Sequence, residues 1–383
     1  MRIVMFSNTY LPSTSGVVTS VALFRQGLMN ANHEVHLIVP QYEGFKDREP
    51  YIFRFPALDL SDRINISLVL PFQPLIEPTV RGIMPDIIHS QHPVWMGDLA
   101  MAFAHDLRVP LIFTFHTRYD EYAQSYVPIV AGLASKVAEE VVRRYMRQCT
   151  HIVAPTPAIR DLILREYPID TPVSVIPSPV DLARFEEKDS KRIRQEFGLD
   201  EYELLLYMGR VAKEKGLDLL IDAFAKVVAE RPQAILLLVG GGPYRRALES
   251  LVQRHGLSRK VIFTGIVPHE EIPDYAAAAD LFVFSSITET QGLVLVEAMA
   301  AGVPVVAVEA PGPIDILAEG GGLLVPAEED AFVQAVLTLL EDEVRRKEIG
   351  EEALRLAQPY AISETTNRML AVYEEAISSV RGN

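Results

Sequence analysis

Residues 176–181 read Ile-Pro-Ser-Pro-Val-Asp, and this stretch divides the 383-residue chain into two halves of the same kind. Two prolines within three residues can continue neither a helix nor a central strand. On both sides of it, short apolar runs alternate with segments in which apolar residues recur about every 3.6 positions. A chain of this length also favours two domains. We therefore predict domains at 1–180 and 181–362, with a linker near 176–200.

The apolar runs are predicted to be buried strands. In the first half they are residues 3–6, 35–39, 87–89, 111–115 and 152–154. In the second half they are residues 204–207, 235–239, 261–264, 281–284 and 305–308. Unbroken apolar strands interleaved with helices are typical of parallel sheets with helices on both faces. The predicted fold class is α/β, with two doubly wound Rossmann-like domains facing each other across a cleft. Ligands are expected at the carboxyl ends of the strands.

The segment after Pro359-Tyr360 has a helical pattern from about residue 363 to 383, and no strand follows it. The proline should end the preceding helix. The last helix then either crosses back to pack on the first domain or ends the second domain as a simple terminal helix. The pattern alone does not decide between these two arrangements.

The formal net charge of −15 argues against a general nucleic-acid-binding protein. Residues 1–180 carry 15 Lys and Arg against 17 Asp and Glu, whereas residues 181–383 carry 21 against 34. Only the first half could therefore approach an anionic surface without strong repulsion. The single cysteine, Cys149, excludes a disulfide framework and a multi-cysteine metal site. Without a secretion signal or a run of about 18 apolar residues, we expect a cytoplasmic protein.

The most specific motif is Glu289-Thr-Gln-Gly-Leu-Val-Leu-Val-Glu297, in which a glycine precedes an apolar helix start. The free amides of Gly292, Leu293 and Val294 could bind a phosphate, because helix N-termini attract anions. Glu289 could accept hydrogen bonds from a polyol, and Glu297 could reach ribose hydroxyls. The spacing alone is equally compatible with two surface glutamates beside an ordinary helix.

A second motif, Gly209-Arg-Val-Ala-Lys-Glu-Lys-Gly216, follows one predicted strand and opens the next helix. Cations at this place, beside a helix N-terminus, are typical of a phosphate site. Arg210 could clamp a diphosphate through its fork and Lys215 could add a point charge, whereas Lys213 is expected to face solvent. A basic turn without a ligand is the alternative.

Other polar residues at predicted strand ends are weaker signals. His116 follows the strand 111–115, and His89 and His92 lie at a similar position, although single histidines are more often structural. The loop 10–16 has one glycine, so the dinucleotide fingerprint is absent there. The glycines at 240–242 lack the Lys-Ser/Thr of a nucleotide triphosphatase and also suit a plain turn. No Asp-x-Asp occurs, so a carboxylate-bound divalent metal is not indicated.

The combination of Gly-Arg-x4-Lys-Gly at 209–216 with Glu-x7-Glu at 289–297 resembles the retaining glycosyltransferases of family 4, which have the GT-B fold. The resemblance covers essentially the whole chain. It includes Gly16 in the first loop, His116 after a strand, Ser-Pro-Val-Asp at 178–181 and Gly-Leu-Leu-Val-Pro at 322–326.

The resemblance implies a nucleotide-sugar donor, bound mainly by the second domain. Because the chain has no Asp-x-Asp, we expect that the enzyme needs no cofactor and no metal. The resemblance assigns the diphosphate to Arg210 and Lys215, sugar hydroxyls to Glu289, and ribose to Glu297. It places Gly16 near the diphosphate and the acceptor, and His116 beside the transferred sugar. The implied catalytic set is His116, Arg210, Lys215 and Glu289. The implied donor-binding set is Gly16, Gly209, Val267, Gly292, Leu293, Val294 and Glu297.

The resemblance also implies retention of anomeric configuration by front-face attack, with the leaving phosphate as base. No protein nucleophile is then needed, in contrast to the two-carboxylate glycosidases. Val267, after the strand 261–264, would offer backbone groups to the base. Relatives that use guanine often have an acidic residue just beyond it, where Pro268-His269 stands here. This favours uridine, and we expect a UDP-sugar, with glucose over galactose.

For the acceptor, the stretch His116-Thr-Arg-Tyr-Asp-Glu-Tyr122 resembles part of the diacylglycerol glucosyltransferases, which make membrane glycolipids. The resemblance places Tyr10, Tyr119 and Tyr122 on the acceptor side. Residues 130–148 read as a basic amphipathic helix, which can lie in a lipid interface. Its expected membrane contacts are Lys136, Arg143, Arg144 and Arg147. It could equally be a surface helix packed on its own domain, and the apolar stretch 68–83 could be an acyl groove or core.

The expected protein is thus a peripheral UDP-glucose:diacylglycerol glycosyltransferase at the inner face of the cell membrane. Three alternatives are carried forward. They are a soluble transferase of the same family acting on a sugar or small polyol, a sugar-nucleotide epimerase on the same fold, and a non-catalytic sugar-nucleotide-binding protein.

Overall fold

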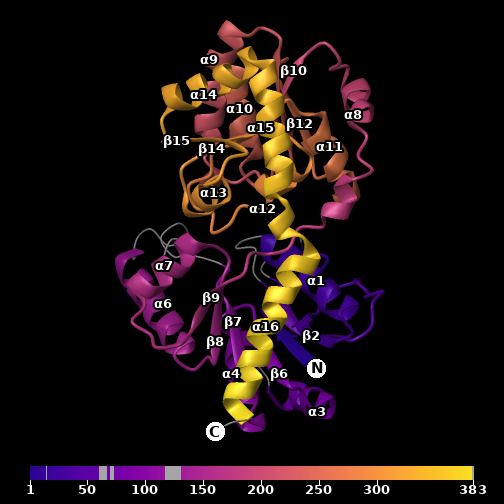
Figure 1. Ribbon diagram of the computed structural model, residues 1–383, viewed down its shortest axis with the longest axis vertical. Helices are drawn as coiled ribbons and strands as arrows, with labels where there is room; N and C mark the ends of the chain where they lie inside the picture. Colours follow the sequence, from indigo (N-terminus) through magenta and orange to yellow (C-terminus); the bar gives the residue numbers. More distant parts are fainter. Residues whose placement is uncertain (14, 60–66, 70–72, 117–130, 382–383) are drawn as a thin grey trace. The chain divides into compact units, whose positions relative to one another are not determined.

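The computed structural model describes residues 1–383 except 14, 60–66, 70–72, 117–130 and 382–383. The chain forms two compact units (Figure 1). Unit 1 comprises Met1–Pro179 together with Ile362–Asn383, and unit 2 comprises Val180–Ala361. The chain passes between the units within one residue of the expected boundary, and the C-terminal helix belongs to unit 1.

Unit 1 is built on a parallel sheet with the strand order β3-β2-β1-β6-β7-β8-β9. These strands are β1 (Arg2–Phe6), β2 (Glu34–Pro40), β3 (Ile52–Phe55), β6 (Ile87–Ser90), β7 (Leu111–Thr114), β8 (His151–Ala154) and β9 (Val173–Val175). A small antiparallel pair joins β4 (Ala57–Asp59) and β5 (Ser67–Val69). The strand order changes direction between β1 and β6, and such switch points are where doubly wound domains bind ligands.

Successive residues of a strand point to opposite faces of a sheet. Because the strands are apolar at successive positions, both faces of this sheet are apolar, and helices cover both. Ile3 and Met5 of β1 pack in one core, and Val4 and Phe6 pack in the other. The helices are α1 (Gly16–Asn30), α3 (Gln73–Ile83), α4 (Met96–Leu107), α6 (Ala131–Met146), α7 (Pro157–Glu166) and α16 (Ile362–Arg381). α16 packs beside α1 in the core of Ile3 and Met5, which resolves the open question about the last helix (Figure 1).

Unit 2 has a second parallel sheet with the order β12-β11-β10-β13-β14-β15. Its strands are β10 (Glu203–Met208), β11 (Ala234–Val239), β12 (Val261–Gly265), β13 (Leu281–Phe284), β14 (Val305–Val308) and β15 (Gly322–Val325). Its helices are α8 (Ser190–Phe197), α9 (Leu217–Glu230), α10 (Arg245–Arg254), α11 (Ile272–Ala278), α12 (Leu293–Ala300), α13 (Pro311–Ile316), α14 (Glu329–Glu341) and α15 (Glu343–Leu356). The switch point lies between β10 and β13. The predicted class of two doubly wound α/β domains is confirmed.

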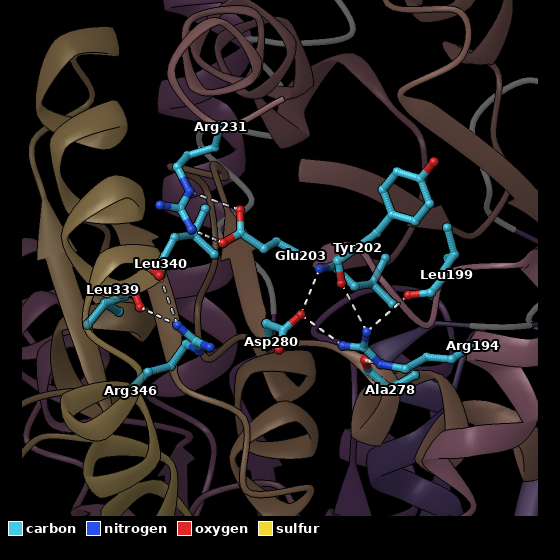
Figure 2. A network of polar contacts seen from close by, with 11 residues as sticks. Arg194, Leu199, Tyr202, Glu203, Arg231, Ala278, Asp280, Leu339, Leu340 and Arg346 are labelled. Carbon is cyan, nitrogen blue, oxygen red and sulfur yellow. Dashed lines mark hydrogen bonds and ion pairs between the residues drawn. The ribbon is translucent and has the colours of Figure 1, made fainter. Parts of the chain in front are cut away.

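The linker expected near 176–200 is largely absent, because most of that segment packs into unit 2. Arg194 of α8 donates hydrogen bonds to the carbonyl oxygens of Ala278 (2.9 Å), Leu199 (3.1 Å) and Tyr202 (3.0 Å). Its remaining nitrogen forms a 2.8 Å ion pair with Asp280, which also accepts a hydrogen bond from the Leu204 amide (Figure 2). Arg194, in the charged segment before β10, therefore anchors α8 to the amino end of this strand.

Candidate functional site

Two loops of unit 2 meet at its switch point, one following β10 and the other following β13. The Ser285 hydroxyl donates to the carbonyl oxygen of Lys215 at 3.0 Å, and the Thr288 hydroxyl donates to that of Glu214 at 3.4 Å. Gly216 approaches so closely that an added Cβ would lie 2.5 Å from the Ser285 carbonyl oxygen. The two predicted motifs thus form one continuous surface.

Lys215 and Glu289 form an ion pair on this surface. Their side chains are 20% and 18% exposed, so both charges are held mostly out of water but remain reachable. The backbone of Glu289 is fixed as well, because its carbonyl accepts a 3.1 Å hydrogen bond from the Gly312 amide. A cation that suits a phosphate therefore lies beside a carboxylate that suits sugar hydroxyls.

Arg210 is held at both its backbone and its side chain. Its guanidinium forms an ion pair with Glu214, and its carbonyl oxygen accepts a 3.1 Å hydrogen bond from the hydroxyl of Tyr207. Tyr207 is fully buried in β10, and burial together with the nearby Glu289 and Glu214 carboxylates raises its pKa. The hydroxyl therefore stays protonated and donates its hydrogen to the loop that follows β10.

The glycine-rich turn after β11 supports the same loop. The Val211 amide donates to the Gly241 carbonyl at 2.9 Å, and an added Cβ on Gly240 would overlap the Gly209 carbonyl oxygen. Gly240 also has φ near 137°, which side chains rarely adopt. The backbone of this turn therefore supports the loop that carries Arg210. The sequence of the turn did not suggest this role.

The helix α12 begins beside Glu289. Gly292 caps it with φ near 84° and without any side-chain cap, so its first amides point outward from a dipole end that favours anions. Glu297 lies one turn further along, and burial raises its pKa to about 7 although Arg184 acts in the opposite direction. Val267, half-buried after β12, precedes His269, whose carbonyl and ring are held by Arg184.

The switch point of unit 1 carries the predicted histidines. His116, two residues beyond β7, lies 2.7 Å from the side-chain oxygen of Gln91, measured at its Nε2. His89 is buried between the Tyr373 hydroxyl (2.6 Å) and the Thr114 hydroxyl (2.7 Å), which makes it structural. His92 accepts a 3.2 Å hydrogen bond from the Asn8 amide. Burial lowers the pKa of all three rings, to about 3 for His89 and His116 and about 4 for His92.

The remaining predicted residues divide into three groups. Gly16 begins α1 and is exposed, with Ser15 capping the helix through the Val18 amide at 3.3 Å. Tyr10 is 1% exposed and packs in the core of unit 1, so its side chain offers little surface to an acceptor there. Tyr119 and Tyr122 lie outside the described residues.

The predicted membrane residues lie on or beside α6. They differ in their exposure and in whether the protein itself pairs their charges. Lys136 and Arg144 are exposed. Arg143 is paired with Glu140, and Arg147 donates to the Pro168 carbonyl at 2.8 Å. Within the described ranges, no helix is long and apolar enough to cross a membrane.

Comparison with known proteins places both units among glycosyltransferases. Residues 14–184 match the family described as Glycosyltransferase Family 4, and residues 189–355 match Glycosyl transferases group 1. The chain is 31% identical to the alpha-monoglucosyldiacylglycerol synthase of Streptococcus pneumoniae over 315 residues, which cover 80% of this chain and 71% of that protein. It is also 31% identical to the synthase of the same name from Acholeplasma laidlawii, with 80% of each chain covered.

Solved structures share the fold. Sucrose-phosphate synthase from Thermosynechococcus elongatus has a TM-score of 0.81 at 22% identity, with 99% of both chains covered. HepE from Anabaena, solved with UDP and glucose, has a TM-score of 0.80 at 20% identity, with 98% of this chain and 100% of that chain covered. Two parallel-sheet Rossmann-like domains of this kind define a GT-B glycosyltransferase. The chain belongs to glycosyltransferase family 4, as its motifs predicted.

Several residues around the predicted site were not predicted from the sequence. Tyr207 looked like one more core residue of a strand, and Glu214 like one charge of a basic turn. Gln91 stands between two histidines that were noticed, and its place directly after a strand was the available signal. Asn8, after β1, is buried and accepts a 3.1 Å hydrogen bond from the Met96 amide.

Proposed function

We propose that this glycosyltransferase moves glucose from UDP-glucose to 1,2-diacylglycerol at a membrane surface, with retention of configuration and without a metal. The observation that carries the proposal is the Lys215–Glu289 ion pair at the switch point of unit 2. A cation able to bind a phosphate and a carboxylate able to bind hydroxyls then lie next to each other, which supports a sugar diphosphate as the donor.

Each donor group has a proposed partner in unit 2. Arg210, Lys215 and the amides of Gly292 to Val294 receive the diphosphate and stabilise the charge that develops as it leaves. Glu289 accepts hydrogen bonds from the sugar, and Glu297 from the ribose. The backbone of Val267 and the loop held by Arg184 face the base. Arg210, Lys215 and Glu289 are already held by ion pairs and hydrogen bonds within unit 2, which would reduce the reorganisation needed during the reaction.

The proposed step breaks the bond between the sugar C1 and the diphosphate oxygen and forms a bond from C1 to the acceptor hydroxyl oxygen. The acceptor proton passes to a leaving phosphate oxygen, so that UDP and a glycoside result. Glu289 and Glu297 are binding groups in this scheme and do not act as an acid and base pair. His116 would be neutral at physiological pH, because burial keeps its pKa near 3, and so contributes a hydrogen bond to the sugar and no charge.

The lipid acceptor is supported by the names of the two relatives that are 31% identical. It is also supported by α6, where exposed Val137 and Val141 accompany exposed Lys136 and Arg144. A helix with apolar and basic exposed residues can bind an anionic lipid surface.

The test measures UDP release from UDP-glucose with and without diacylglycerol in anionic vesicles, using UDP-galactose and GDP-mannose as donor controls. We expect release that depends on both UDP-glucose and diacylglycerol, and a product whose anomeric proton shows the same configuration as the donor. Slow hydrolysis that lipid does not change would overturn the lipid acceptor, and a panel of soluble sugars and polyols would then follow. Turnover only with GDP-mannose would overturn the uridine assignment.

A further inference from the structure

The loop after β6 contains a backbone conformation that is unusual for the residue that adopts it. The Gly97 amide donates to the Val94 carbonyl at 3.1 Å, which closes a turn of residues 94–97. The second residue of this turn, Trp95, has φ 57° and ψ −95°. These angles are close to those of the first central position in a type II′ turn, where glycine is the preferred residue. The chain has one tryptophan, and it occupies that position.

The backbone of Trp95 is more strained than that of Arg108, which follows α4 and also has a positive φ. Arg108 has φ 55° and ψ 45°, in the left-handed helical region that residues other than glycine can visit. The ψ of Trp95 lies far outside that region, where a bulky side chain is an outlier. Such a conformation lowers the stability of the fold and persists only where the surrounding structure imposes it.

Hydrogen bonds on both sides of Trp95 impose this conformation. The buried side chain of Asn8, which follows β1, donates to the Val94 carbonyl at 3.2 Å and accepts from the Met96 amide at 3.1 Å. The amide of Trp95 itself donates to the Asp98 carboxylate at 2.8 Å. The loops after β1 and β6 therefore hold Trp95 in place together.

The strained residue lies at the switch point of the unit 1 sheet. β1 and β6 are the neighbouring strands between which the strand order changes direction, and doubly wound domains bind ligands there. Trp95 is only partly buried, so part of its surface is open to a ligand. Backbone strain of this kind collects at functional sites, where it presets a side chain for its task.

We propose that Trp95 binds the acceptor lipid at the junction between its acyl chains and its free hydroxyl. The proposal rests on the proposed function, in which the acceptor is 1,2-diacylglycerol. A tryptophan suits such a junction because its ring is apolar and its indole N–H donates a hydrogen bond. The ester and hydroxyl oxygens of diacylglycerol can accept that bond while the acyl chains pack on the ring. Trp95 is assigned to the acceptor because each group of the donor has a proposed partner in unit 2.

The first test uses the intrinsic fluorescence of the full chain, which reports on Trp95 directly because the chain has no other tryptophan. The protein is titrated with 1,2-dioctanoylglycerol in the presence of UDP. We expect the emission to move to shorter wavelength as the ring leaves water, with half of the change near the KM of the same lipid. UDP alone should leave the emission unchanged.

A matched control moves the reporter to another place in unit 1. Tyr51 also has a positive φ and is 45% exposed, but it precedes β3 and so lies at the amino edge of the sheet. The emission of the double variant Tyr51→Trp with Trp95→Phe should not respond to 1,2-dioctanoylglycerol. A response equal to that of the wild type would show that the lipid acts on the protein as a whole, and would overturn the contact.

Two further substitutions separate a ligand contact from a structural role. Trp95→Ala removes the ring and keeps the strain, whereas Trp95→Gly removes both, because glycine adopts positive φ readily. Both should raise the KM of the lipid at least about tenfold and leave the KM of UDP-glucose nearly unchanged. Trp95→Gly should nevertheless unfold at a higher urea concentration than Trp95→Ala. A purely structural tryptophan would change the two KM values alike, which would overturn the contact.

The outcomes distinguish this contact from the proposed function. Emission that 1,2-dioctanoylglycerol leaves unchanged, or a wild-type lipid KM in both Trp95→Ala and Trp95→Gly, overturns the contact even if the lipid is glucosylated. An emission shift without any release of UDP supports the contact and overturns the proposed reaction.

Discussion

Lys215 and Glu289 are 74 positions apart in the sequence and form an ion pair across the switch point between β10 and β13. Each belongs to a loop whose backbone is fixed by the other, through the Ser285 hydroxyl and the close approach of Gly216. The pair therefore orders the surface on which the proposed diphosphate and sugar bind. Removing one partner should both delete a ligand contact and release the other side chain.

Glu289→Ala is expected to lower turnover by more than about 100-fold, as is typical for the loss of a positioned polar group. Lys215→Ala is expected to weaken UDP binding, measured by calorimetry. Lys213→Ala is the matched control, because Lys213 lies on the same turn but is exposed. The double variant should lose less than the two single losses combined, since the residues act as a unit. Near-wild-type turnover in Glu289→Ala would show that Glu289 does not bind the transferred sugar.

Gly240→Ala should weaken donor binding without a contact to the donor. The new Cβ overlaps the Gly209 carbonyl oxygen and displaces the loop that carries Arg210. Gly256→Ala is the matched control, because Gly256 has φ near 71° but nothing within 4 Å of its Cβ position. Both substitutions strain the backbone, and only the first should raise the dissociation constant of UDP, by about tenfold or more. Equal effects in the two variants would mean that strain alone is responsible.

Arg194→Ala tests the opposite end of the same sheet. Arg194 bonds to three carbonyl oxygens and to Asp280, and its loss removes four part-buried contacts that tie α8 to this end of the sheet (Figure 2). We expect a free energy of unfolding lower by about 2 kcal/mol in urea titrations. UDP affinity in the folded variant should be unchanged, because the network lies at the amino end of β10. A parallel loss of UDP affinity would show that the anchor and the site are coupled.

The fold could be predicted because it depends on patterns that are local in the sequence. Unbroken apolar runs such as 204–207 and 281–284 became β10 and β13, and the prolines at 177 and 179 mark the change of unit. The strand β9 was missed because three half-buried residues give too short an apolar run. The destination of α16 could not be predicted, since it depends on a core that forms only when Ile3 and Tyr373 meet.

The site could be predicted only where a motif carries its own chemistry. Lys215 and Glu289 were found in separate motifs, but their pairing depends on the order of the strands, which no local pattern contains. Tyr10 is buried, and its expected place on the acceptor side stays a prediction, because an aromatic residue in a loop near a glycine suits either a ligand or a core. Gln91 was overlooked because a lone glutamine has no spacing signature, and its meaning depends entirely on the neighbouring strand.

Glu297 should make donor binding depend on pH. Burial raises its pKa from the ordinary 4.5 to about 7, and the carboxylate accepts stronger hydrogen bonds than the protonated acid. UDP affinity should therefore fall about fivefold as the pH drops from 8 to 6, and Glu297→Gln should lack this part of the profile. The folded protein also holds a proton that the unfolded chain releases between pH 4.5 and 7. Wild-type stability should thus decrease as pH rises through that window relative to Glu297→Gln. Identical pH profiles in both proteins would contradict the assignment.

The exposed face of α6 should determine binding to anionic lipid. Val137 and Val141 are 57% and 40% exposed and share a face with Arg144, since residues four and seven positions apart lie on one side of a helix. Because Arg143 and Arg147 are engaged within the protein, Lys136 and Arg144 are the charges available to a membrane.

Reversal of both charges, in Lys136→Glu with Arg144→Glu, should reduce co-sedimentation with anionic vesicles at least about tenfold, because each basic residue near such a surface contributes about 1 kcal/mol. Arg345→Glu with Lys347→Glu on α15 changes the net charge equally in unit 2 and is the control. Binding to uncharged vesicles should be alike in both variants. If the two double variants lose anionic vesicles equally, the total charge of the chain governs binding and α6 is an ordinary surface helix.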